Sequence, residues 1–239
     1  MPRITTLSVT RDDIIKAALR KLDVLGEGET PTAEDYTNCS FGLNLLLKAW
    51  ALEGTFLWKT TELTLPLVSG TVSYQIGDTA TGTGALVTNR PIKLIDACFV
   101  RDANSNDVPV TLLSRQEYNA LGNKTTSGTV TQIFYDPQLT NGVLKVFGKP
   151  ADSLSSLHLV AQIPIYDFSS GSETLDLPQE GYQAAVYGLA DEMMDEYPKP
   201  SAVTIQRITG KAAQFKEQLT SFSQEEASVF FMPNSSSFR

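Results

Sequence analysis

Apolar residues recur at helical spacing near the N-terminus and predict two amphipathic helices joined by a short Gly/Pro turn. The first helix begins at Thr10, whose hydroxyl can cap free amides, and ends at Gly26. The second begins with the capping-box pattern of Thr32 and Asp35 and ends at Gly54. A helical hairpin cannot bury both of its apolar stripes by itself, so the chain must supply a packing partner elsewhere.

Helical spacing of apolar residues returns near the C-terminus. One apolar stripe runs over residues 182–193 and a second over residues 205–222. Four amphipathic helices can share a core that neither pair could form alone. We therefore predict one helical domain that is discontinuous in sequence and consists of residues 1–56 and 178–222.

Between the two helical ends the apolar period changes to two, which predicts strands. The turn signal at Ser69 and Gly70 separates two such runs and predicts a hairpin. Short strands with turn signals continue along this segment, a pattern typical of an antiparallel β-sandwich or barrel-like domain. The predicted fold class is α+β: a discontinuous four-helix domain, an inserted β domain at residues 57–177, and an extended C-terminal arm at residues 223–239.

The formal net charge of −8 argues against a surface that binds nucleic acid by neutralising its phosphates, because such surfaces cluster Lys and Arg. Cys39 and Cys98 form no metal-ligand pattern and indicate buried thiols in a reducing compartment. The N-terminus has no apolar signal core, and no run approaches the ~20 apolar residues of a membrane helix. We expect a protein made in the cytoplasm, with no membrane contact and no cofactor.

The second predicted helix has two apolar faces. Phe41, Leu45 and Leu52 lie on one face, and a separate stripe that includes Leu43 and Trp50 lies on the other. A helix with two apolar faces needs two neighbours, either both in its own bundle or one of them in another subunit. The sequence leaves both arrangements open, and we treat Phe41, Leu45 and Leu52 as a candidate subunit interface.

Four carboxylates follow the apolar stripe of the third predicted helix. Asp191 and Asp195 are four residues apart, as are Glu192 and Glu196, so each pair would share a face of one helix. Hard cations bind such oxygen clusters, but no His, Asn or Gly loop completes a site here. We therefore predict an acidic, solvated face and no metal site.

Other candidate chemistry is weak, and no catalytic residue is predicted. His158 is the only histidine and lies in a predicted strand, without a Gly-x-Ser-x-Gly motif, so a hydrogen-bonded strand histidine is expected. Gly82 and Gly84 lack the remainder of a phosphate-binding or dinucleotide-binding loop. Aromatic residues of the β segment could form a sugar-binding surface, although core or interface positions are the expected role: Trp58, Tyr74, Phe134, Tyr135 and Tyr166.

Two regions carry a resemblance to a known family. They are residues 13–24 with 47–54 at one end of the chain, and residues 184–197 with 212–215 at the other. Their order and spacing resemble the head-to-tail adaptors of short-tailed phages, also called tail accessory factors or packaged DNA stabilisation proteins. The resemblance covers somewhat under half of the chain, and its motifs are packing motifs. The β insert departs from the shortest family members and is more similar to the sheet domain of longer adaptors such as tail tubular protein A.

The resemblance implies a structural virion protein without enzymatic activity. In the family, adaptors form a twelvefold ring that docks under the portal of a filled head, extends the DNA channel and connects to the tail nozzle or fibres. The helical domain would form the ring wall and the β domain would face the tail. Asp191, Glu192, Asp195 and Glu196 could line the channel and repel passing DNA, which would not be bound sequence-specifically. Such a protein would lie in the virion neck or tail, and in the host cytoplasm during assembly.

The C-terminal arm contains one apolar segment with no evident place in the core, and the resemblance implies that it binds the portal. A terminus that is disordered or packed on its own chain is the alternative for this arm. Two other functions stay open: a β-rich carbohydrate-binding or cell-wall-degrading tail module, and a neck or head-completion protein of a longer-tailed phage. We expect a monomer before assembly. The residues assigned to portal binding are Val229, Phe230, Phe231, Met232 and Pro233.

Overall fold

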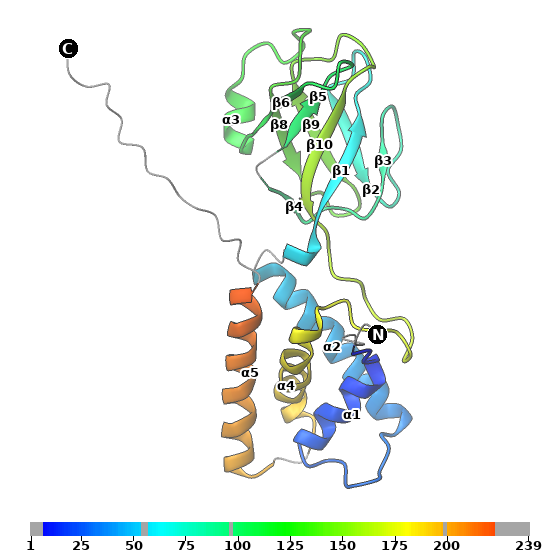
Figure 1. The fold of residues 1–239 in the computed structure, drawn as a ribbon, viewed down its shortest axis with the longest axis vertical. Helices are drawn as coiled ribbons and strands as arrows, with labels where there is room; N and C mark the ends of the chain where they lie inside the picture. The colour runs from blue at the N-terminus through cyan, green and yellow to red at the C-terminus, as the bar shows by residue number, and fades with distance from the viewer. Residues whose placement is uncertain (1–6, 54–56, 96–97, 198–199, 223–239) are drawn as a thin grey trace, which may run out of the picture.

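A computed structural model describes residues 7–53, 57–95, 98–197 and 200–222. Within these ranges the chain forms five α-helices and two five-stranded sheets, with no closed barrel. The fold is therefore mixed α+β, as the sequence predicts. Figure 1 shows four of the helices gathered below the strands, with the remaining short helix among the strands. No helix in the described ranges is long and apolar enough to cross a membrane.

The helices begin at the capping residues that the sequence indicates. Thr10 and Asp13 form a reciprocal capping box at the start of α1 (Arg11–Lys21). Thr32 and Asp35 exchange the equivalent hydrogen bonds at the start of α2 (Ala33–Glu53), with the Thr32 amide donating to Asp35 over 2.8 Å. The remaining helices are α3 (Arg115–Ala120), α4 (Tyr182–Glu192) and α5 (Ala202–Phe222).

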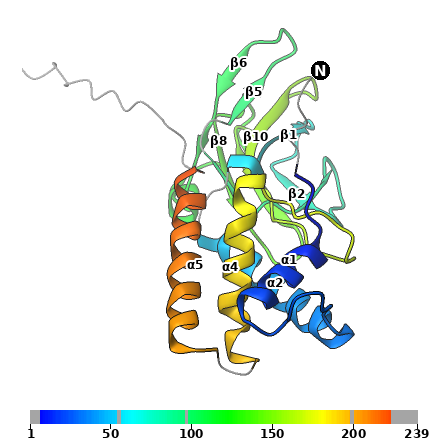
Figure 2. The same cartoon turned by 60° about the horizontal axis from the view of Figure 1, so that its bottom comes forward.

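Helices α1, α2, α4 and α5 form one lobe, which we call the helical lobe. Its central helix is α4. Every residue of α4 from Ala184 to Ala190 is buried. Figures 1 and 2 both show α4 between α5 on one side and α1 and α2 on the other. Gly188 allows α2 to approach α4 closely, because a Cβ atom at this position would lie 2.9 Å from Trp50 Cζ2 and 3.0 Å from Leu46 Cδ2. One apolar cluster therefore draws on helices from both ends of the chain.

The β lobe comprises ten strands and α3, and its two sheets share a second apolar cluster. One sheet has the order β1-β10-β5-β6, with β4 also pairing β10, and the other has the order β3-β2-β9-β8-β7. Most pairs are antiparallel, but β2 pairs β3 and β7 pairs β8 in parallel. The strands of the first sheet are β1 (Thr60–Pro66), β4 (Lys93–Leu94), β5 (Phe99–Arg101), β6 (Asp107–Pro109) and β10 (Ser156–Gln162). Those of the second are β2 (Ser73–Gly77), β3 (Leu86–Val87), β7 (Thr111–Leu112), β8 (Gln132–Asp136) and β9 (Gly142–Phe147).

The hairpin predicted around Ser69 and Gly70 is wrong, because β1 and β2 belong to different sheets. β1 pairs β10, and β2 pairs β9. Leu65 of β1 and Tyr74 of β2 are both fully buried in the apolar cluster that the two sheets share. The turn thus carries the chain from one sheet to the other. As a result, the apolar side chains of β1 and β2 lie in one core.

The two lobes are joined where the chain enters and leaves the strands. Lys59 is the last residue of the short η1 helix (Leu57–Lys59). Its ammonium group pairs with Asp176 and lies 4.5 Å from the centre of the Tyr166 ring. The returning segment is held on α2, where Lys48 Nζ donates to the Ile165 carbonyl over 2.9 Å. The Lys59 contacts join the outgoing segment to the returning one, and the Lys48 contact holds the returning segment on α2.

We predict that Gly188→Ala destabilises the protein by about 1–3 kcal/mol, because the added methyl group meets the rigid indole of Trp50 in a packed core. Gly210→Ala in α5 is the matched control, since nothing lies within 4 Å of a Cβ atom there. The control should gain about 0.5–1 kcal/mol from helix propensity. Urea denaturation followed by circular dichroism measures both. Stabilisation by both substitutions would contradict the described packing of α4.

We predict that Lys59→Met costs more stability than Lys48→Met. The Lys59 side chain is 5% exposed, and its substitution removes the ammonium group that pairs with the partly buried Asp176. We therefore expect a loss of about 1–3 kcal/mol in the free energy of unfolding. The Lys48 side chain is 43% exposed, and its pair with Asp167 should contribute about 0–1 kcal/mol. The same denaturation experiment compares the two variants. Equal losses would show that the Lys59 pair does not hold the lobes together.

Candidate interaction surfaces

The second apolar face of α2 is not used within the described chain. Phe41 is 67% exposed, Leu45 is 49% exposed and Leu52 is 80% exposed. On the opposite face, Leu43 and Trp50 are buried against the other helices. The alternative in which α2 is the central helix of its own bundle is therefore wrong, because α4 occupies that position.

Phe41, Leu45 and Leu52 form a continuous stripe, which we call the α2 stripe. Ala49 is also exposed and lies between Leu45 and Leu52 along the same face. The stripe is about 16 Å long at a rise of about 1.5 Å per residue. Single exposed apolar side chains are ordinary on soluble proteins, but a contiguous row of large ones usually marks a contact surface. The row can accommodate another helix or an extended apolar segment.

The four candidate channel carboxylates are exposed, but they do not share one helix as predicted. Asp191 and Glu192 end α4, whereas Asp195 lies in the tighter η3 turn (Met193–Asp195), with Glu196 after it. The change of helical pitch means that residues four apart no longer stack as they do in an α-helix. Asp191 is also engaged, because the Thr209 hydroxyl donates to its carboxylate over 2.7 Å. Within the described residues, no three His, Cys, Asp or Glu side chains are placed to hold a metal ion.

A part-buried hydrogen bond follows this change of pitch. The Tyr197 hydroxyl donates to Asp35 over 2.7 Å and lies 3.7 Å from the sulfur of Cys39, so the end of η3 is tied to the start of α2. Burial and the hydrogen bond to Asp35 raise the pKa of Tyr197. Burial opposes ionisation of Asp35, but hydrogen bonds from Tyr197 and Thr32 outweigh it and lower the pKa of that carboxyl. Cys39 and Cys98 are buried thiols, as predicted.

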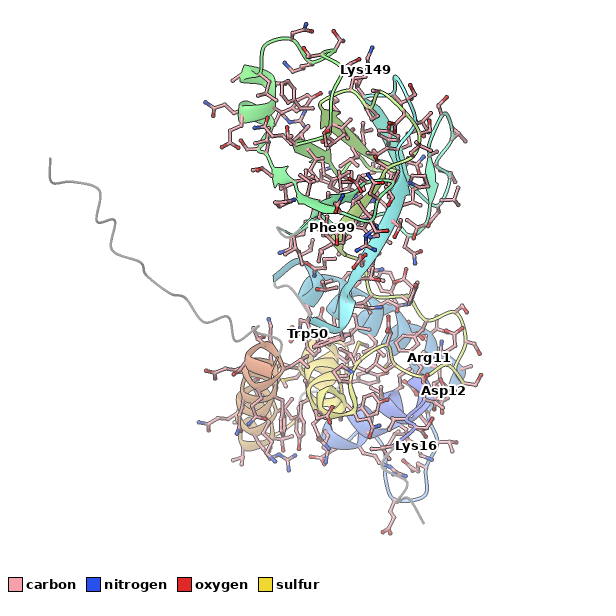
Figure 3. The ribbon with its side chains drawn as sticks, turned by 45° about the horizontal axis from the view of Figure 1, so that its top comes forward. Arg11, Asp12, Lys16, Trp50, Phe99 and Lys149 are labelled. Atoms are coloured by element: carbon pink, nitrogen blue, oxygen red, sulfur yellow. The ribbon has the colours of Figure 1, made fainter. Side chains whose placement is uncertain are left out.

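The residues assigned to portal binding, 229–233, lie outside the described residues. The last described element, α5, ends at Phe222 beside the lobe junction (Figure 1). Leu219 of α5 approaches Gly181 at the start of α4, which places this end of α5 at the top of the helical lobe. Figure 3 labels Trp50 of α2 at the same level. The described end of α5 therefore lies close to the end of α2 that carries Leu52 (Figure 1).

The histidine expected to be hydrogen-bonded within a strand is at the centre of a polar chain on the outer face of the first sheet. His158 Nδ1 lies 2.5 Å from Glu62 Oε1, and Nε2 lies 3.1 Å from the hydroxyl of Ser156. The ring of Phe99, labelled in Figure 3, stacks on the imidazole at a centroid distance of 4.5 Å. This order of groups matches that of a catalytic Ser-His-acid triad, and the sequence did not reveal it because Glu62 lies on a different strand.

The remaining requirement of acyl transfer, a pair of free amide donors, conflicts with the position of Ser156. Ser156 and His158 lie on β10, which is paired on one side with β1 and on the other with β5. Amide groups of a strand with two neighbours donate mostly within the ladder, so donors for an oxyanion would have to come from outside β10. The chain of Glu62, His158 and Ser156 is therefore best described as a cross-strand link.

The aromatic residues that could have formed a sugar-binding surface do not share a surface. Tyr74, Phe134 and Tyr135 are buried in the β lobe, and burial raises the pKa of Tyr135 to about 12. Trp58 packs against the apolar cluster of the helical lobe. Tyr166 is exposed, but its ring contacts Lys59 at the junction. Core and junction positions thus account for all five side chains.

Comparison with known proteins does not single out any of these surfaces. The chain matches no family model and no curated protein.

Proposed function

We propose that this protein is a structural virion protein, a head-to-tail adaptor whose subunits form a ring under the portal of a short-tailed phage. The observation that carries the proposal is the α2 stripe, in which Phe41, Leu45 and Leu52 remain exposed on an otherwise well-packed helical lobe. A ring of identical subunits needs such a surface on every copy. The protein would have no enzymatic role and would extend the channel through which DNA passes.

We infer the finer architecture in the same way. The helical lobe would be a discontinuous four-helix domain formed by residues 1–56 and 178–222, and residues 57–177 would be an inserted β-sandwich. Support for the first comes from an apolar cluster that joins α1 and α2 to α4 and α5. Support for the second comes from an apolar cluster that both sheets share. The helical domain would form the ring wall, and the β domain would reach the tail nozzle or fibres.

Charge is compatible with a DNA channel of this kind. The formal net charge of −8 disfavours adhesion of passing DNA, and the exposed carboxylates after α4 would repel its phosphates if they faced the lumen. The protein would be present in the virion neck or tail as a dodecamer, and in the host cytoplasm during assembly. Its partners would be the portal protein, bound by residues 229–233, and the tail nozzle or fibre proteins.

The alternative function is a β-rich carbohydrate-binding or cell-wall-degrading tail module. The polar chain of Glu62, His158 and Ser156 is the one observation that favours it. We rank it second because β10 is a central strand and because the aromatic residues of the β lobe are largely in the core.

We predict that Phe41→Glu leaves the fold intact but prevents ring formation on the portal. Placing a charge in an interface that is apolar in the assembled ring should weaken each contact at least about 100-fold. Leu139→Glu is the matched control, since Leu139 is 95% exposed in the β lobe. Sedimentation and negative-stain microscopy with purified portal measure assembly. Normal rings from Phe41→Glu would exclude the α2 stripe as the subunit interface.

We predict that replacing Asp191, Glu192, Asp195 and Glu196 together with Ser slows DNA ejection, because the channel wall would lose its repulsion of phosphates. Asp78→Ser/Asp152→Ser, in exposed loops of the β lobe, is the charge-removal control. Ejection from purified virions is followed with a DNA-binding dye. Thermal unfolding verifies the fold, since Asp191 bonds Thr209. Ejection at the wild-type rate would remove the assignment of these residues to the channel.

A further inference from the structure

We propose that the C-terminal arm covers the α2 stripe in the free subunit. The occupant of the stripe would be the apolar segment of residues 229–233 of the same chain. This docking concerns one isolated subunit and requires no partner. Its regulatory consequence, that the arm keeps subunits apart until the portal captures it, rests on the function proposed above.

The first argument is the position at which the arm begins. α5 and α2 both run toward the β lobe, and both end beside the junction between the lobes (Figure 1). Leu52, the most exposed member of the stripe, lies in the last turn of α2. From Phe222 to Val229 the chain can span up to about 24 Å at about 3.4 Å per residue. Because α5 ends near the last turn of α2, which carries Leu52 (Figure 1), this span compares with a stripe about 16 Å long and lets residues 229–233 approach its Leu52 end.

Residues 229–233 and the α2 stripe are both apolar. The apolar segment is Val229, Phe230, Phe231, Met232 and Pro233, and Asn and Ser residues follow it. An apolar segment of this length can cover an apolar stripe that would otherwise face water, while the polar residues after it stay in solvent.

The third argument is the advantage of a tethered ligand. A short flexible tether gives its end an effective concentration on the order of 1 mM. A segment that binds the stripe with a Kd of about 0.1 mM would then be docked about ten times more often than free. A second subunit at about 10 µM would compete with this tethered segment at a disadvantage of about 100-fold. Weak contacts are thus sufficient to keep the stripe covered.

The consequence is a coupling between portal binding and assembly. Residues 229–233 cannot contact the α2 stripe and the portal at the same time. Capture of the arm by a portal would therefore uncover the stripe on that subunit. Ring formation would then be confined to subunits that are already in place.

The test uses a pair of cysteines in the full-length monomer. Leu45→Cys/Phe230→Cys places one thiol on the stripe and one on the arm, whereas Leu139→Cys/Phe230→Cys places the first thiol on an exposed turn of the β lobe. The two native cysteines are buried in both variants. We expect the stripe pair to form an intramolecular disulfide about tenfold faster than the control pair under mild oxidation. Equal rates, or disulfides formed mainly between two molecules, would overturn the proposal.

A second measurement does not depend on introduced cysteines. Phe230→Ser/Phe231→Ser should increase binding of an environment-sensitive apolar dye several-fold, because the stripe loses its cover. Phe238→Ser, in the same arm but outside the apolar segment, is the matched control and should leave dye binding unchanged. Adding Phe41→Ser to the double variant should abolish most of the increase. Unchanged dye binding in the double variant would contradict the inference.

These outcomes are separable from those of the proposed function. If the disulfide fails to form preferentially while Phe41→Glu still prevents rings, the arm does not cover the stripe but the adaptor assignment stands. If the disulfide forms preferentially while Phe41→Glu assembles normally on the portal, the stripe holds the arm and is not the subunit interface.

Discussion

The packing of α4 against helices from the other end of the chain is the interaction on which the rest of the structure depends. Trp50 and Leu46 lie so close to Gly188 that no side chain fits between them. This contact brings the two ends of the sequence into one apolar cluster. The strands between them must then leave and re-enter the helical lobe at one place. Lys59 and Asp176 make their ion pair there, which ties the outgoing segment to the returning one.

The same packing explains why α2 keeps an unused face. α4 is enclosed by its neighbours and takes the position at the centre of the lobe. α2 therefore lies at the periphery and buries Leu43 and Trp50, while Phe41 and Leu52 on its other side face outward. An apolar row in that position lowers solubility unless something covers it. The α2 stripe is thus a consequence of the lobe's topology, and its apolar sequence requires an explanation outside the core.

The starts of the helices were predictable because they depend on neighbouring residues. The pairing of the strands was not, because it depends on residues that are far apart in the sequence. The start of α1 follows from Thr10 and Asp13, and the start of α2 from Thr32 and Asp35, because a capping box depends on four consecutive residues. The turn at Gly70 was equally visible, but a turn does not specify which sheet the next strand joins. The contact of Glu62 with His158 spans 96 residues and depends on strand register, so no local pattern could indicate it. The chain tightens after Glu192, and the hydrogen bond that follows joins Tyr197 to Asp35, which is equally remote in the sequence.

The polar groups of the first sheet in the β lobe link its strands through His158. Glu62, His158 and Phe99 come from three strands of one sheet, and the imidazole contacts both of the other side chains. A catalytic serine must be approached by its substrate and must have free donors beside it, whereas Ser156 belongs to a strand paired on both sides. Cross-strand contacts of this kind stabilise a sheet by joining its strands. In the proposed adaptor, which would connect two larger assemblies, rigidity of the β lobe is a sufficient reason for such a network.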